Sequence, residues 1–168
     1  MNYYLQALSS KYADFSSRSR RSEYWFFTLF SFLAAIILNM VDIALGTFSY
    51  EAQAGLLTSI YGLLVLIPTL AVTVRRLHDI GKSGWAMLIV YASICILGFF
   101  TMFFAMLSAA QRMTEGQFGL AMAMLVITMI GLIILFLVWL CTDSQPGRNR
   151  FGENPKTTPP AINNFYKT

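Results

Sequence analysis

Four long apolar runs constrain this chain more than any other feature of its sequence. They cover about residues 24–46, 55–74, 85–108 and 118–141. A helix needs about 20 apolar residues to cross a hydrocarbon core roughly 30 Å thick. The sequence therefore predicts an all-α polytopic membrane protein with four transmembrane helices, which together form a single domain over residues 1–155.

The composition agrees with a chain that is mostly surrounded by lipid. Hydrophobic residues make up 57% of the 168 residues and charged residues only 12%. A soluble domain is usually about a quarter charged, so half that charge cannot cover a surface that faces water. The four runs leave no room for a separate soluble domain, and we expect residues 156–168 to form a flexible cytoplasmic tail.

The segment before the first run predicts a short N-terminal helix in the interfacial layer of the membrane. Its apolar residues recur at helical spacing, at Leu5, Leu8, Tyr12 and Phe15. Aromatic residues at the ends of the runs are typical of an interfacial belt. The expected anchors are Tyr24, Trp25 and Trp85.

Lysine and arginine predict the orientation in the membrane. Eleven of them precede the first run, join the second to the third, or follow the fourth: Lys11, Arg18, Arg20, Arg21, Arg75, Arg76, Lys82, Arg148, Arg150, Lys156 and Lys167. The two loops on the opposite side contain only Arg112. Because basic residues accumulate in cytoplasmic loops, we expect both termini to be cytoplasmic.

Two details of the second run predict local structure. Pro68 has no N–H group, so the carbonyl of Leu64 lacks its helical donor and the helix should kink there, more as a packing feature than as a gate. Arg75 and Asp79 lie four residues apart and could pair if the helix continues beyond the run.

Three polar segments, at about residues 18–23, 75–84 and 143–154, should converge on one face of the membrane. The candidate binding residues in or beside them are Arg18, Arg20, Arg21, Arg75, Arg76, His78, Asp79, Lys82, Arg148 and Arg150. Arginine binds phosphate through two parallel N–H groups, and basic pockets near the cytoplasmic surface suit anionic lipid headgroups. We hypothesise that this face binds anionic phospholipid or a partner membrane protein, which includes another copy of the chain. The alternative is that the charges only set topology and neutralise one another.

These segments carry motifs that resemble a bacterial membrane-protein family known as domain of unknown function 805. The first motif is an arginine-rich entry to a Glu-aromatic-Trp sequence, at Arg18, Arg20, Arg21, Glu23, Tyr24 and Trp25. The central motif is at Arg75, Arg76, Leu77, His78, Asp79, Gly81, Ser83, Gly84 and Trp85, and the last at Gly147, Asn149, Phe151, Gly152 and Pro155. Ser17 departs from the glycine usual in the family. The resemblance implies a small protein of the bacterial cytoplasmic membrane and no established activity.

Two other functions have weaker support in the sequence. A membrane-embedded enzyme acting on a phosphorylated headgroup would use His78 as acid or base, but neighbouring helix positions do not face each other, so Asp79 is poorly placed to orient it. A small transport subunit would need Asp42, with Asn39 one turn earlier. Asp42 lies close to the far end of the first run, where we expect water to hydrate it.

Cofactors and nucleic acid are not expected. A single histidine without paired cysteines makes a metal site improbable, and no sequence motif indicates a cofactor. The net charge of +4 is explained by loops that face anionic lipid, so we expect no nucleic-acid binding. Because the arguments for His78 as acid or base are weak, we also expect the protein not to be an enzyme.

Overall fold

The computed structural model describes residues 2–110 and 113–156, which fall into two compact units. One unit runs up to Lys82 and resumes at Asp143, and the other is Ser83–Thr142. Among the described residues, four helices are long and apolar enough to cross a membrane: α2 (Arg21–Leu45), α3 (Leu56–Asp79), α4 (Trp85–Ala109) and α5 (Glu115–Cys141). The four predicted transmembrane helices are therefore confirmed. The single domain stays a prediction, and the expected flexible tail lies outside the described residues except for Lys156.

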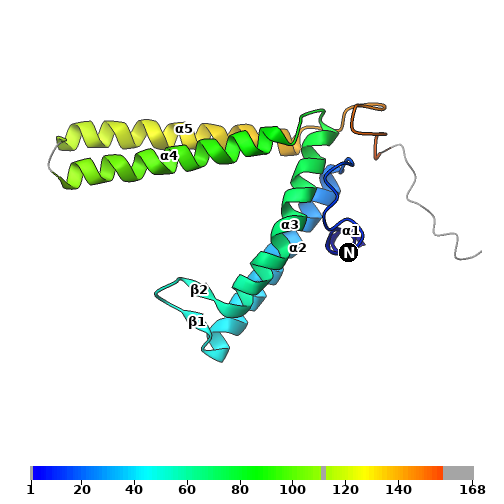
Figure 1. The fold of residues 1–168 in the computed structure, drawn as a ribbon, viewed down its shortest axis with the longest axis horizontal. Helices are drawn as coiled ribbons and strands as arrows, with labels where there is room; N and C mark the ends of the chain where they lie inside the picture. The colour runs from blue at the N-terminus through cyan, green and yellow to red at the C-terminus, as the bar shows by residue number, and fades with distance from the viewer. Residues whose placement is uncertain (1, 111–112, 157–168) are drawn as a thin grey trace, which may run out of the picture. The chain divides into compact units, whose positions relative to one another are not determined.

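In the first unit α2 and α3 run side by side (Figure 1). Gly46 ends α2 in the left-handed conformation, with φ of 70°, which glycine adopts without a steric penalty. Two short antiparallel strands, β1 (Phe48–Ser49) and β2 (Ala54–Gly55), then turn the chain back into α3. The apolar runs did not predict these strands, because each is only two residues long.

Asp42 closes this end of the α2–α3 pair. Its side chain is fully buried, and its carboxylate accepts hydrogen bonds from the backbone N–H groups of Leu57 and Thr58, both at 2.9 Å. The hydroxyls of Thr47 and Thr58 donate to it at 2.6 and 2.9 Å. Asp42 therefore caps the N-terminus of α3, where free N–H groups and the helix dipole favour a negative charge. The expectation that water hydrates Asp42 is wrong, because protein donors take the place of water.

Gly55 leaves the space that this carboxylate occupies. A Cβ atom on Gly55 would lie 2.1 Å from Oδ2 of Asp42. We therefore expect Gly55→Ala to displace the carboxylate from its donors and to lower the melting temperature in detergent by at least about 4 °C. Gly62→Ala is the matched control, because nothing lies within 4 Å of its added Cβ and alanine favours a helix. Equal melting temperatures for the two variants would contradict this role of Gly55.

The predicted short N-terminal helix is confirmed as α1 (Asn2–Leu8), which lies against α2 and α3 (Figure 1). Ala7 is fully buried, and the Tyr4 ring lies 5.7 Å from that of Phe27. The Tyr4 hydroxyl is 3.0 Å from that of Tyr61 in α3. Leu5 is exposed, so α1 contacts the hairpin with only part of its predicted apolar face. Its place in the interfacial layer stays a prediction.

The segment after α1 supplies the hydrogen bond that Pro68 removes. The hydroxyl of Tyr12 donates to the carbonyl of Leu64 at 2.8 Å, and α3 continues through the buried Pro68 to Asp79. An unpaired carbonyl is costly in lipid, where no water can replace the missing donor. Tyr12 therefore links the N-terminal segment to the position in α3 where Pro68 interrupts the backbone hydrogen bonds.

We expect Tyr12→Phe to destabilise the protein by about 1–3 kcal/mol, the usual cost of a polar group left unsatisfied away from water, because this face of α3 would meet lipid. The cost should be smaller in a Pro68→Ala background, because alanine at this position supplies a backbone donor to Leu64. Unfolding of the two single variants and the double variant in detergent measures this coupling. Tyr50→Phe, at a tyrosine with 75% exposure, is the control. Equal costs in both backgrounds would show that Tyr12 does not serve the Leu64 carbonyl.

The second unit is a pair of long helices, α4 and α5, which lie side by side (Figure 1). Thr114 and Gln117 form a capping box, in which each side chain accepts a hydrogen bond from the other residue's backbone N–H. This cap starts α5 at Glu115, three residues before the predicted position, because it satisfies N–H groups that a helix start leaves free.

The predicted aromatic anchors differ in their exposure. Trp25 and Trp85 are 40% and 71% exposed, which leaves both rings accessible to lipid. Tyr24 is half-buried and meets Trp25 edge to face, with ring centroids 5.3 Å apart. Their place at the membrane interface stays a prediction.

Candidate functional site

The end of α3 carries the central group of predicted site residues. The helix continues five residues beyond the predicted end of the second span, so Arg75, Arg76, His78 and Asp79 are all helical. All four are buried, because two distant segments cover them. Ser19 donates its backbone N–H to the carbonyl of Arg75, and the N–H of Gln145 donates to the carbonyl of Asp79. The three polar segments therefore meet within one unit, as their charges suggested.

A buried carboxylate holds these segments together. Nε of Arg18 donates to Oδ1 of Asp79 at 3.1 Å, while Nη1 of Arg76 and the hydroxyl of Ser144 donate to Oδ2. The side chains of all three ionic partners are at most 1% exposed. The expected pairing of Arg75 with Asp79 is wrong, because Arg76, one turn before Asp79, takes that place.

Arg18 also organises the C-terminal segment. Its Nη1 donates to the carbonyls of Gly147 and Gly152 at 2.9 and 3.1 Å, and its Nη2 to the carbonyl of Gln145 at 2.8 Å. Both glycines have positive φ, which lets the chain turn tightly around the guanidinium. Sequence reasoning grouped these segments by charge but missed these partners, since backbone carbonyls carry no signal in a sequence.

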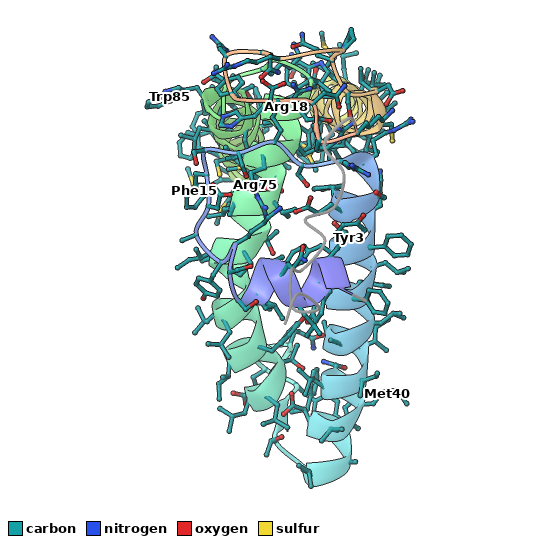
Figure 2. All side chains as sticks on the ribbon, turned by 90° about the vertical axis from the view of Figure 1, so that its right-hand side faces the viewer. Tyr3, Phe15, Arg18, Met40, Arg75 and Trp85 are labelled. Carbon is teal, nitrogen blue, oxygen red and sulfur yellow. The ribbon has the colours of Figure 1, made fainter. Side chains whose placement is uncertain are left out.

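Arg75 forms an ion pair with a different acid, Glu23. Its Nη1 donates to Oε1 of Glu23 in α2 at 3.1 Å, and Nζ of Lys11 lies 3.5 Å from the same oxygen. Figure 2 shows Arg75 extending from α3 toward α2, while Arg18 lies nearer the end of the pair. Arg75 is fully buried, yet its Nε and Nη2 have no hydrogen-bond partner among the described residues.

The main contact of the His78 side chain is ring stacking and not a hydrogen bond to a carboxylate. Its ring stacks on Phe151, with centroids 3.7 Å apart and planes within 4°. The Arg150 guanidinium lies 4.6 Å from the centroid of Phe151. The carboxylate of Asp79 bonds Arg18, Arg76 and Ser144, so it does not orient the imidazole as a catalytic partner would.

The remaining predicted site residues lie around this buried group. Arg20 and Lys82 are half-buried, and Arg21, Arg148 and Arg150 are exposed. Arg21 lies 3.4 Å from Asp143, and Arg148 lies 3.7 Å from Glu153. Exposed ion pairs of this kind contribute little to stability, about 0–1 kcal/mol, so their side chains can exchange partners.

Two acids outside the spans have low pKa values. Burial raises the pKa of Asp14, but hydrogen bonds from Ser17 and Ser16 outweigh it and lower the pKa to about 2. A hydrogen bond from Lys156 lowers the pKa of Asp143, and so does the backbone N–H of Ser144. Both acids are therefore ionised at neutral pH, and Asp14 shapes the turn that leads into Arg18.

No group of three or more His, Cys, Asp or Glu side chains that could hold a metal ion occurs within residues 2–110 and 113–156. The expectation that the protein binds no metal or cofactor stays a prediction.

Residues 12–153 match the family model described as "Protein of unknown function (DUF805)". The chain belongs to the DUF805 family. The matched range begins at Tyr12 and includes all of the residues that surround Asp79, from Arg18 to Gly152. The family resemblance found in the sequence motifs is thus confirmed.

Two curated relatives of the chain are named as inner membrane proteins. The chain is 33% identical over 159 residues to "Inner membrane protein YhaH" of Escherichia coli K12, covering 95% of this chain and 100% of the relative. It is also 33% identical over 157 residues to "Inner membrane protein YhaI" of the same strain, covering 93% and 97%. No solved structure matches the chain significantly. With four apolar spans, this DUF805 member is an inner membrane protein.

We expect Asp79→Asn to destabilise the cap at the end of α3 strongly, because it leaves Arg18 and Arg76 buried without their shared counter-charge. Removing one partner of a buried ion pair costs about 3–5 kcal/mol. Limited proteolysis within residues 143–156 should become faster in this variant, and unfolding in detergent should occur at lower temperature. Glu153→Gln, which removes an exposed pair, should change neither. Wild-type protection of the segment in Asp79→Asn would refute the role given to this carboxylate.

Proposed function

We propose that this protein is a non-enzymatic module of the bacterial cytoplasmic membrane that binds anionic phospholipid. In this proposal both termini and the end of α3 face the cytoplasm, and the binding surface is the set of accessible basic residues around Asp79. That surface consists of Arg20, Arg21, Lys82, Arg148 and Arg150, and we call it the basic rim.

The observation that supports the proposal is an excess of positive charge at one end of the first unit. Residues 2–23, 75–84 and 143–156 together carry ten basic residues: Lys11, Arg18, Arg20, Arg21, Arg75, Arg76, Lys82, Arg148, Arg150 and Lys156. They carry five acids: Asp14, Glu23, Asp79, Asp143 and Glu153. No lysine or arginine occurs between Arg21 and Arg75, so the β1–β2 end of the hairpin has none. This distribution favours a cytoplasmic position for the basic end.

Burial divides the basic residues by role. Arg18 and Arg76 are fully engaged with Asp79 and the surrounding backbone, so they hold the segments together. The basic rim is more accessible and lies at the end of α3, where lipid headgroups would surround it. Each basic residue close to an anionic membrane surface contributes about 1 kcal/mol of attraction. A partner membrane protein with an acidic surface is the second candidate, since it would meet the same charges.

Catalysis and transport have less support from the geometry. His78 stacks on Phe151, and its neighbour Asp79 serves the arginines, so the acid and base of the enzyme hypothesis do not act together. Asp42 accepts four hydrogen bonds as the cap of α3, which is a structural role.

Native mass spectrometry of protein extracted with its lipid tests the proposal. In a variant with Arg20, Arg21, Arg148 and Arg150 all changed to glutamine, we expect at least a tenfold loss of retained anionic phospholipid, since about 1.4 kcal/mol is a factor of ten. The matched control changes the same four residues to lysine, which keeps the charge and should keep the lipid. Undiminished anionic lipid in the glutamine variant would exclude the basic rim as the binding surface.

A further inference from the structure

We propose that the buried, unpaired edge of the Arg75 guanidinium binds a phosphate group inside the first unit. This site goes beyond the basic rim, because it consists of different, buried residues. Arg75 lies one turn before the end of α3 and is fully buried, and Figure 2 shows it directed toward α2.

The two unpaired groups of Arg75 form a fork. Nε and Nη2 lie on the same edge of the planar guanidinium, so their N–H bonds point in nearly the same direction. This is the edge through which arginine binds two oxygens of a phosphate or carboxylate at once. Glu23 does not occupy the edge, because its Oε1 bonds Nη1 at 3.1 Å. Neither Nε nor Nη2 has a hydrogen-bond partner in the part of the chain that the structure describes.

The local charge balance also favours an anion. Ion pairs link Lys11 and Arg75 to Glu23, and Arg18 and Arg76 to Asp79. Four cations therefore share two carboxylates, an excess of two positive charges within this group. Five of these six side chains are at most 6% exposed, and buried charges need a partner because water cannot solvate them. A phosphate would supply one or two negative charges.

A buried hydroxyl adjoins the same stretch of α3. Ser19 is fully buried, and its Oγ has no hydrogen-bond partner among the described residues. The backbone of Ser19 lies between the two arginines, since its N–H donates to the carbonyl of Arg75 at 3.1 Å and its carbonyl accepts from Arg76 at 3.4 Å. The Ser19 hydroxyl is therefore a second buried group without a hydrogen-bond partner among the described residues, in the segment whose backbone contacts Arg75.

The chain's own nearby carboxylates have other partners. Glu23 accepts from Nη1 of Arg75, Asp79 binds Arg18 and Arg76, and Asp14 accepts from Ser16 and Ser17. No carboxylate among these described residues therefore pairs with the Nε–Nη2 edge, and the phosphate would be either the headgroup of a phospholipid or inorganic phosphate. The two sources share the chemistry that Arg75 recognises, and experiment distinguishes them.

The test compares wild type with Arg75→Lys, which keeps the positive charge but loses the fork. Native mass spectrometry measures phospholipid that survives mild delipidation. Thermal unfolding of the delipidated protein then measures stabilisation by inorganic phosphate against chloride at equal ionic strength. We expect Arg75→Lys to weaken phosphate or phospholipid binding at least about tenfold, the value of one charge-assisted hydrogen bond. Arg148→Lys, at a side chain with 78% exposure, should bind like wild type.

The outcomes separate the two sources and the failure of the site. One retained phospholipid that is lost in Arg75→Lys identifies a headgroup, whereas stabilisation of wild type alone by inorganic phosphate identifies free phosphate. Equal binding by wild type and Arg75→Lys, or no binding by wild type, would overturn the proposal.

A second variant covers the case in which Arg75→Lys does not fold. Glu23→Gln removes a negative charge next to the fork and leaves the fork intact, so it should bind phosphate more tightly than wild type. Weaker or unchanged binding in this variant would also overturn the proposal. The glutamine variant of the basic rim should keep the single phosphate or phospholipid bound at Arg75 while it loses the other retained anionic lipid, so failure of the basic rim and failure of this site are distinguishable.

Discussion

The buried carboxylate of Asp79 is the interaction on which the rest of the first unit depends. It accepts hydrogen bonds from Arg18, which precedes α2, from Arg76 in its own helix, and from Ser144, which follows α5. Segments 127 positions apart in the chain, at Arg18 and Gln145, meet because two buried guanidinium groups need the same counter-charge. The covering segments in turn bury the end of α3.

α3 shows what a polar group in a membrane helix requires. At its start, the carboxylate of Asp42 accepts hydrogen bonds from the N–H groups of Leu57 and Thr58. Where Pro68 interrupts the helical hydrogen bonds, the hydroxyl of Tyr12 donates to the carbonyl of Leu64. Lipid offers no hydrogen bonds, so every such group must find its partner within the protein. Residues from α2 and from the N-terminal segment supply these partners, which binds the three parts into one unit.

The hydrogen-bond partners of each arginine distinguish the structural arginines from those that remain able to bind a ligand. Arg18 and Arg76 have partners within the fold, and the exposed pairs of Arg21 and Arg148 are weak enough to exchange with lipid. Arg75 has a buried counter-ion and still has two unpaired donors among the described residues. A buried cation with an unused edge is unusual for a purely structural residue, and this is why it is the best candidate for a specific phosphate.

The sequence by itself determined the four spans, the family and the convergence of three basic segments, because span length, motif spacing and charge are local properties. It also predicted the missing donor at Leu64, which follows from the covalent structure of Pro68. Only the tertiary structure decided that Arg76 rather than Arg75 pairs with Asp79, that Asp42 is buried as a cap, and that Tyr12 reaches Leu64. Each of these depends on which neighbouring segment faces a side chain, and the rotation and packing of helices decide that from contacts far apart in the chain.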